Sequence, residues 1–362
     1  EKLPSHYDTV NIWESSWPTA LAPMQDVTGL PFMRIIANYG APDLFFTEFF
    51  RVHEHSRLDP EILTSITENP SGKPVFAQLI GESIPELCRV ADLLKEFPVA
   101  GVDLNMGCPA PRVYKKKVGG GLLKDPPKIA KILESLRSRI EGRLTVKMRI
   151  GFEDDSNFDA ILEIIKDSGV DMLSLHTRTV LGGYRSTPNH SYAARAAEFL
   201  PCPVLLNGNV TTAQGAVRLK EMNHVCGIMV GRSAIRNPWI FRQIRELQQG
   251  RPIYQPQMKE LYQYISSLFE SLKKPELCDI RLVARMKKFL NFVGLSVCPK
   301  GEFLHDMRRA RTPNQLFSVC SKYLLEDGIA DNFMPLEPFE NLVARPGQES
   351  CQNNPVPSLL AS

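Results

Sequence analysis

Short apolar runs alternate with amphipathic stretches along most of the chain. Between residues 20 and about 247, each run ends in polar or glycine residues and is followed by a stretch with helical periodicity. The runs are Ala20–Met24, Leu44–Phe50, Pro74–Ile80, Gly101–Met106, Leu144–Ile150, Met172–His176, Pro203–Asn207 and Gly227–Gly231. Eight strands separated by helices predict an α/β chain folded as a (β/α)₈ TIM barrel, although a doubly wound sheet uses the same alternation with fewer strands.

The pattern changes after Pro252 and Pro256. Residues 257 to about 325 have helical periodicity without strand-like alternation. We therefore expect a barrel domain over residues 1–250 and a helical domain over 257–325. From Asp331 onward the chain is polar and rich in proline, which predicts an irregular or disordered acidic tail over residues 331–362.

Composition excludes several classes of protein. The chain has 362 residues, of which 43% are hydrophobic and 23% charged, as in an ordinary globular protein. No apolar run reaches the roughly 18 to 20 residues of a membrane span, and the first residues lack a signal-peptide pattern. Eight cysteines occur without a CxxC pair. We therefore expect reduced thiols, no metal site and a cytoplasmic protein.

Polar residues gather at the ends of the apolar runs. In a barrel, the carboxyl ends of the strands meet at one face, where active sites are built. The residues that end or follow a run are Gln78, Asn105, Cys108, Lys147, Arg149, His176, Asn207 and Arg232. Taken singly, each could satisfy loop backbone, but together they predict a site at this face.

The segment Asn105–Pro109 carries the candidate reactive group. Cys108 lies in a turn between Gly107 and Pro109, with Lys115–Lys117 nearby, which indicates a thiol that acts as acid or nucleophile rather than a buried core cysteine. The triple glycine Gly119–Gly121 is typical of a mobile loop, such as a lid.

Two glycine-containing turns follow the seventh and eighth runs. Asn207–Asn209 and Gly231–Ser233 lie where barrels commonly bind phosphate through backbone N–H groups, and Arg232 can add charge. They predict a cofactor with a phosphate group. Lys147 could stabilise the negative charge of a reduced flavin, and His176 could contact the same ring or a phosphate.

Several segments together resemble the tRNA-dihydrouridine synthases. They are Ala22–Met24, Thr47–Glu48, Gln78–Gly81, Asp103–Pro109, Val146–Phe152, His176–Arg178, Asn207–Asn209 and Gly231–Ala234, in the family's order over residues 20 to 320. The resemblance implies an FMN-binding barrel, a helical tRNA-binding domain, NADPH as reductant and a monomer.

The resemblance also implies residue roles. FMN would be held by Pro23, Met24, Gln78, Lys147, His176, Asn207, Asn209, Gly231 and Arg232, and the uracil would face Asn105, Cys108 and Arg149. Reduced FMN would deliver hydride to carbon 6 of the uracil. Cys108 would then donate a proton to carbon 5 as general acid.

Further segments around Thr47–Val52, Gly183–Arg185 and Val283–Leu290 look most like the bacterial subfamily that acts on uridine 16 of the D-loop. A stacked uridine must be extruded to reach a barrel mouth, and Arg51 and Tyr184 are candidates to contact it. Another tRNA position or ribosomal RNA is the alternative target. An FMN barrel acting on a small molecule and an RNA-binding protein without flavin chemistry are the rival functions.

The net charge of +3 conceals an uneven distribution. Nine basic and two acidic residues lie between Arg281 and Lys322, whereas six acidic residues and one arginine follow Leu324. Such a run is often only a solvated face. Next to a uracil site, it predicts a surface for tRNA phosphates that includes Arg285 and Lys288.

Overall fold

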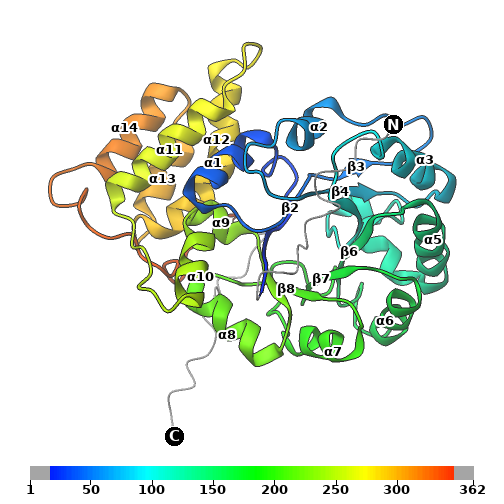
Figure 1. Ribbon diagram of the computed structural model, residues 1–362. Coiled ribbons are helices and arrows are strands. Elements are labelled where there is room, and N and C mark those ends of the chain that lie inside the picture. Colours follow the sequence, from blue (N-terminus) through cyan, green and yellow to red (C-terminus); the bar gives the residue numbers. More distant parts are fainter. Residues whose placement is uncertain (1–16, 346–362) are drawn as a thin grey trace, which may run out of the picture. The chain divides into compact units, whose positions relative to one another are not determined.

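Parallel strands of a single sheet form a barrel in the N-terminal part of the molecule (Figure 1). The structure is a computed structural model that describes residues 17–345. Around the barrel the strands follow the order β1 (Thr19–Leu21), β9 (Gly227–Val230), β8 (Val204–Asn207), β7 (Met172–His176), β6 (Arg143–Arg149), β5 (Gly101–Met106), β4 (Val75–Ile80) and β2 (Phe45–Phe46). A short additional strand, β3 (Phe50–Arg51), pairs with the end of β4.

The barrel closes between its first two strands. Ala20 and Leu44 form a parallel bridge, and the backbone N–H of Leu21 donates to the carbonyl of Leu44 at 3.1 Å. Each of the eight predicted apolar runs contributes a strand to this closed ring. The predicted (β/α)₈ barrel is therefore confirmed, and the doubly wound alternative is wrong.

The barrel interior is apolar at one end and polar at the other. Buried residues that face one another inside it are Ala20, Ala22, Leu44, Phe46, Phe76, Ala100, Met172, Leu205 and Met229. Side chains alternate along a strand, so residues two positions further on face the same interior. Beyond Phe76, Met172 and Leu205 these residues are Gln78, Ser174 and Asn207, which places polar groups at the carboxyl ends of the strands.

Amphipathic helices cover the outside of the barrel (Figure 1). They are α2 (Pro60–Thr67), α3 (Ile84–Leu94), α5 (Pro126–Arg139), α6 (Phe158–Asp167) and α7 (Ser191–Phe199). Local chemistry favours the start of α2: the Asp59 carboxylate accepts from the N–H of Glu61 at 2.8 Å, and a proline begins the helix. The periodic apolar side of each helix is the side that it buries.

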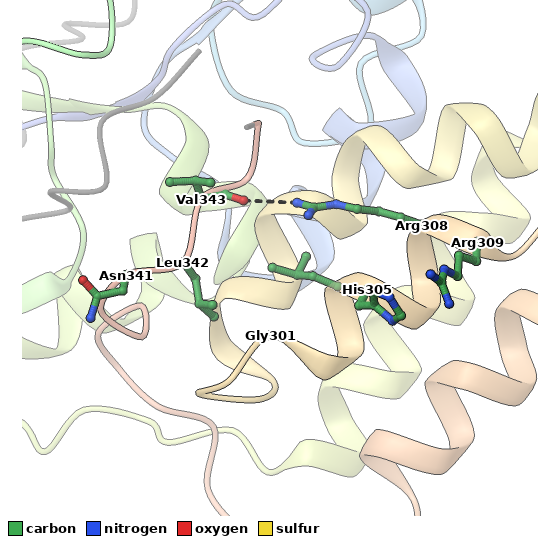
Figure 2. Close-up of a pocket in the computed structure, with 8 residues that line it drawn as sticks. Gly301, His305, Arg308, Arg309, Asn341, Leu342 and Val343 are labelled. Atoms are coloured by element: carbon green, nitrogen blue, oxygen red, sulfur yellow. Dashed lines mark hydrogen bonds between the residues drawn. The ribbon is translucent and has the colours of Figure 1, made fainter. Parts of the chain in front are cut away.

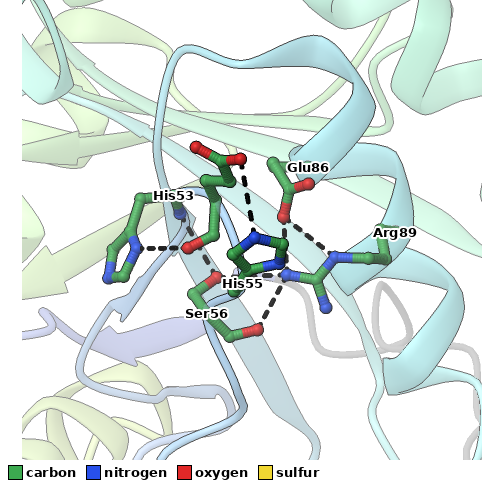
Figure 3. A network of polar contacts seen from close by, with 6 residues as sticks. His53, His55, Ser56, Glu86 and Arg89 are labelled. Atoms are coloured by element: carbon green, nitrogen blue, oxygen red, sulfur yellow. Dashed lines mark hydrogen bonds and ion pairs between the residues drawn. The ribbon is translucent and has the colours of Figure 1, made fainter.

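A polar network ties the loop after β3 to helix α3 (Figure 3). The Arg89 guanidinium donates to the Ser56 carbonyl at 2.7 Å and pairs with Glu86 at 2.6 Å, while Ser56 Oγ accepts from the N–H of His53. The network holds the segment that begins at Arg51, a residue that stays exposed with its guanidinium 5.0 Å from the Phe49 ring centroid.

Internal contacts divide the chain into two units. The first comprises Glu1–Leu30, Pro42–Gly208 and Arg218–Gly231, and includes every strand of the sheet. The second comprises Pro31–Ala41, Asn209–Val217 and Arg232–Ser362. Helices α1 (Leu30–Gly40), α9 (Arg232–Arg236) and α10 (Ile240–Gln248) thus group mainly with the C-terminal helices. The predicted domain boundary near residues 250–256 stays a prediction.

The second unit is helical beyond residue 257. It contains α11 (Met258–Leu272), α12 (Asp279–Val293), α13 (Glu302–Arg309) and α14 (Pro313–Leu324). Leu261, Tyr264, Ile265 and Leu268, which mark the helical period in the sequence, are fully buried on one side of α11. The Tyr264 hydroxyl donates to the carbonyl of Ile235 at 2.9 Å, so the one polar atom on this side is satisfied.

The segment after Asp331 is irregular but packed within the second unit. The buried Arg236 guanidinium donates to the carbonyl of Leu336 at 2.7 Å, and Met334 is buried. Gln257 and Phe333 form an isolated antiparallel bridge. The rest of the predicted tail, residues 346–362, lies outside the described residues. Within residues 17–345, no helix combines the length and apolarity that a membrane span requires.

Candidate functional site

The polar side chains inside the barrel form successive layers. Register pairs Gln78 with Asp103 and Asp103 with Thr145 in the deepest layer. The next layer pairs Asn105 with Lys147 and Lys147 with Ser174. The outermost layer pairs Arg149 with His176 and His176 with Asn207. Parallel register partners project from the same side of a sheet, so these strand-end residues are brought together at one face of the barrel.

A chain of buried hydrogen bonds links the deepest layer to the Cys108 loop. Gln78 Nε2 donates to Asp103 Oδ2 at 2.7 Å, and Asn105 Nδ2 donates to Gln78 Oε1 at 2.8 Å. Asn105 Oδ1 then accepts the backbone N–H groups of Gly107 and Cys108, both at 3.0 Å. The side chain of Asn105 thereby shapes the turn that presents Cys108.

Cys108 is partly exposed and packs beside a small apolar cluster of Phe49, Ile80 and Val113. Its carbonyl accepts the N–H of Gly120 at 3.2 Å. Arg149, which is 2% exposed, donates from Nε to the Gly107 carbonyl at 3.0 Å. Bonds from several elements therefore fix the backbone on each side of the thiol.

The triple glycine is not a mobile loop, and that prediction is wrong. Gly119–Lys124 forms the 3₁₀ helix η1, and all three glycines are buried. A Cβ on Gly120 would lie 2.6 Å from a Val180 methyl and 2.8 Å from the Cys108 carbonyl oxygen. Only glycine allows this backbone to pack directly against the Cys108 turn.

Lys147 lies one layer above Asp103. Its pKa is lowered to about 8, chiefly by burial and then by Arg149, whereas Asp103 and Cys108 act in the opposite direction. Its ammonium makes no hydrogen bond or ion pair within residues 17–345. Lys147 is therefore a cation that a bound anion or electron-rich ring can reach.

His176 is held by a second arginine. Arg178 Nη1 lies 3.1 Å from His176 Nε2, and Arg178 Nε donates to the Ser186 carbonyl at 2.6 Å. A guanidinium only donates, so Nε2 accepts and the proton of the neutral ring is on Nδ1. Tyr184 lies beside this pair: its ring is 6.2 Å from the His176 ring and 5.5 Å from the Arg149 guanidinium carbon.

The remaining predicted cofactor residues of the first unit lie at neighbouring strand ends. Pro23 and Met24 follow β1, where the Met24 carbonyl accepts the N–H groups of Val27 and Thr28 in a tight turn. Asn207 Nδ2 donates to the Met229 carbonyl at 2.9 Å, and Gly231 follows β9 directly. A Cβ at Gly231 would contact only Ala22 and Met24, no closer than 3.5 Å.

The other predicted residues belong to the second unit. Asn209 has a left-handed backbone with φ of 48°, and Arg232 is the first residue of α9. Arg285 and Lys288 lie on α12. The roles expected for these residues stay predictions.

Four residues of the site were not predicted from the sequence. Asp103 and Thr145 belong to the buried chain, Ser174 lies in the layer of Lys147, and Arg178 orients His176. Asp103, Thr145 and Ser174 carried a signal: a polar residue inside an apolar strand, two positions from a rim residue, faces the same interior. Arg178 lies beyond β7 and has no such signal. The bond from Thr145 Oγ1 to Asp103 Oδ1 at 2.6 Å required the tertiary pairing.

The interior fits a flavin by the chemistry of its polar groups. Ser174 Oγ is buried and has no hydrogen-bond partner within residues 17–345, and the Lys147 ammonium lies in the same layer. A buried hydroxyl without a partner is costly unless a ligand supplies one. A hydroxyl and a cation suit the ring nitrogens, carbonyl oxygens and polyol chain of a flavin.

The second unit has a pocket of its own, about 370 Å³ in volume (Figure 2). Helix α13 lines it with His305, Arg308 and Arg309, and residues Asn341–Val343 line the other side. Arg308 donates to the Val343 carbonyl at 3.1 Å, which joins the two sides. This bond and the Arg236 bonds are the reason why the last described residues follow a defined path.

A family model described as dihydrouridine synthase (Dus) matches residues 20–314. The tRNA-dihydrouridine(16) synthase of Neisseria meningitidis serogroup A is 28% identical over 312 residues, which cover 84% of this chain and 93% of that protein. The tRNA-dihydrouridine(16) synthase of Haemophilus ducreyi is 31% identical over 287 residues, covering 75% and 85%. The tRNA-dihydrouridine synthase B of Pasteurella multocida is 28% identical over 256 residues, covering 69% and 77%.

Proposed function

Because this chain belongs to the dihydrouridine synthase family, we propose that it reduces a uridine of tRNA to 5,6-dihydrouridine, at position 16 of the D-loop. The match to the family model over residues 20–314 carries the proposal. The position rests on the names of relatives such as those of Neisseria and Haemophilus. The similarity to a synthase B makes another tRNA position the second candidate.

FMN is the proposed cofactor and NADPH the proposed reductant. Gln78, Lys147, His176 and Asn207 would hold the flavin from the barrel interior, together with Pro23, Met24 and Gly231 at the neighbouring strand ends. Asn209 and Arg232 would add contacts to its phosphate. When bound and reduced, FMN supplies the hydride that the uracil accepts at carbon 6.

Cys108 is the proposed general acid. Hydride addition at carbon 6 leaves negative charge that a proton at carbon 5 must neutralise, and a partly exposed thiol on a firmly held turn can donate that proton. Lys147 adds positive charge near the developing anion. Arg149 holds the Cys108 turn through the Gly107 carbonyl, and Arg149 and Tyr184 would bound the space for the base.

The tRNA would be bound through contacts that lie away from the reacting base. Extruding a stacked base costs a few kcal/mol, which contacts to the phosphate backbone can offset. Arg51 at the rim of the barrel is exposed, and Arg285 and Lys288 lie on the basic helix α12. We assign all three to tRNA contact, with the enzyme acting as a monomer.

The direct test combines an activity assay with mapping of the modified position. Purified protein reconstituted with FMN is incubated with NADPH and tRNA transcribed without modifications, and dihydrouridine is mapped at single-nucleotide resolution. We expect product at position 16 alone. Product at another position would overturn the assignment to uridine 16 but retain the reaction. Oxidation of the reduced enzyme by orotate or simple enones, but not by tRNA, would overturn the function.

A further inference from the structure

Asp103 is a fully buried carboxyl group with no role in the reaction described above. It lies inside the barrel and accepts hydrogen bonds from Thr145 Oγ1 at 2.6 Å and from Gln78 Nε2 at 2.7 Å. A buried carboxylate is costly unless it is well paired. Asp103 begins the chain of hydrogen bonds that runs through Gln78 and Asn105 to the backbone of Cys108.

The direction of every bond in this chain agrees with a carboxylate acceptor at one end and backbone N–H donors at the other. An ionised carboxylate only accepts, so the Gln78 amide must present its NH₂ group to Asp103. The carbonyl oxygen of Gln78 then faces Asn105 and accepts from its Nδ2. Asn105 presents its own oxygen to the N–H groups of Gly107 and Cys108, which can only donate, so the two ends of the chain impose the same order. If the side-chain amide of Gln78 or Asn105 were turned over, a donor would face a donor or an acceptor would face an acceptor.

We propose that Asp103 is a positioning residue for the reaction: through Gln78 and Asn105 it holds the backbone of the Cys108 turn and, together with the N–H groups of Gly107 and Cys108, keeps Asn105 Nδ2 as a hydrogen-bond donor toward the substrate base. Both lone pairs of Asn105 Oδ1 are used by backbone N–H groups, and one hydrogen of Nδ2 is used by Gln78. The other hydrogen of Nδ2 suits a carbonyl oxygen of the base, not its ring N–H. This part rests on the proposed function.

Protonation of Asp103 would break the order of donors and acceptors. Burial raises its pKa to about 6, against the hydrogen bonds from Thr145 and Gln78 and the charge of Lys147, all of which lower it. Above about pH 6 the ionised group accepts from Gln78. Below it, a carboxylic O–H competes as a donor. Lys147, the other titratable group facing Asp103, has its pKa near 8 and would contribute on the alkaline side.

The test uses an isosteric variant and a matched neighbour. In Asp103→Asn the side-chain amide can present either its oxygen or its NH₂ group to Gln78, so the variant removes the constraint on the Gln78 amide while it keeps the shape. Because Gln78 is also a proposed FMN contact, flavin content is measured in the variant and each rate is expressed per bound flavin. On that basis oxidation of the reduced enzyme by tRNA should slow roughly tenfold to hundredfold. The wild-type rate should fall as pH drops through about 6, and this acid limb should disappear in Asp103→Asn.

Thr145→Val is the matched control because it removes only the second bond to Asp103. It should react near the wild-type rate at pH 8, with its acid limb moved to higher pH, since the lost bond favoured the ionised form. If Asp103 had only a structural role, the acid limb of the pH–rate profile would not move in Thr145→Val. The proposal would be overturned if the fall in rate at low pH occurs at the same pH in Thr145→Val as in the wild type. A wild-type rate and pH profile in Asp103→Asn would also overturn it. The result with Thr145→Val decides even if Asp103→Asn fails to fold.

A spectroscopic measurement separates this proposal from the proposed function. In protein labelled with ¹⁵N-cysteine, the backbone amide signal of Cys108, assigned by its loss in Cys108→Ser, should titrate near pH 6 in the wild type and at a higher pH in Thr145→Val. This requires no tRNA reaction. An enzyme that reduces no tRNA but shows the titration would overturn only the function, whereas a signal constant between pH 5 and 7 would overturn the positioning role.

Discussion

Hydrogen bonds to individual backbone atoms hold the turn that carries Cys108. Its N–H is held by Asn105 Oδ1, its carbonyl accepts from Gly120, and the preceding carbonyl of Gly107 accepts from Arg149. These bonds involve the backbone, so the thiol is not needed to maintain the turn. Replacing the thiol should therefore remove its chemistry and leave its surroundings in place.

Cys108→Ala should bind FMN and be reduced by NADPH as the wild type is, while reduction of tRNA falls by about 10²–10⁴-fold, the usual contribution of a positioned acid. Stopped-flow measurement of the two half-reactions separates these steps. Cys88→Ala on α3, which removes a thiol whose one bond is to the Ser135 carbonyl at 3.8 Å, is the control. Unchanged tRNA turnover in Cys108→Ala would exclude the thiol as the acid.

Among the elements, η1 shows how close packing replaces side-chain contacts. The three glycines let neighbouring groups approach the backbone closely: a Cβ on Gly121 would lie 2.6 Å from the Tyr114 carbonyl oxygen, and one on Gly119 would lie 3.0 Å from the Cys108 Cβ. The sequence alone could not distinguish this arrangement from a flexible loop, because both require glycine. The element supports the catalytic turn instead of moving over it.

Gly120→Ala tests this role. Its Cβ would push against Val180 and the Cys108 carbonyl, which should lower the free energy of unfolding by about 1–3 kcal/mol and slow oxidation of the reduced enzyme by tRNA. Gly142→Ala, where nothing lies within 4 Å of the new Cβ, should match the wild type in both. Urea denaturation and single-turnover kinetics provide the two measurements. Wild-type kinetics in Gly120→Ala would mean that η1 does not position Cys108.

For the molecule as a whole, the distribution of charge matters more than its sum. The net charge is +3, yet the helices between Arg281 and Lys322 concentrate basic residues. Helix α12 buries Leu282, Met286 and Phe289 and carries Lys288 on its exposed side. Polyanion binding depends on the local density of cations and releases counterions, so it weakens with salt.

Charge reversal on α12 should identify the tRNA surface. Arg285→Glu with Lys288→Glu should weaken tRNA binding and flatten its dependence on salt concentration, while NADPH oxidation stays unchanged. The same change of net charge at Lys131 and Lys166, both exposed on helices α5 and α6 outside the barrel, is the control. Equal effects of the two double variants would attribute binding to overall charge, not to α12.

The sequence determined the barrel, the family and most residues at its polar face. Strand period and polar strand ends are local properties, so Gln78, Asn105, Lys147, Arg149 and His176 could be placed before any contact was known. The tertiary structure decided which of these groups touch. Asp103 contacts Gln78 and η1 packs against Cys108, and the sequence gives no sign of either contact. Arg178 is only two residues from His176, but the fold decides that its guanidinium reaches Nε2. Hydrogen-bond direction and close packing act over a few ångströms in space, and only the closed barrel brings those atoms within that range.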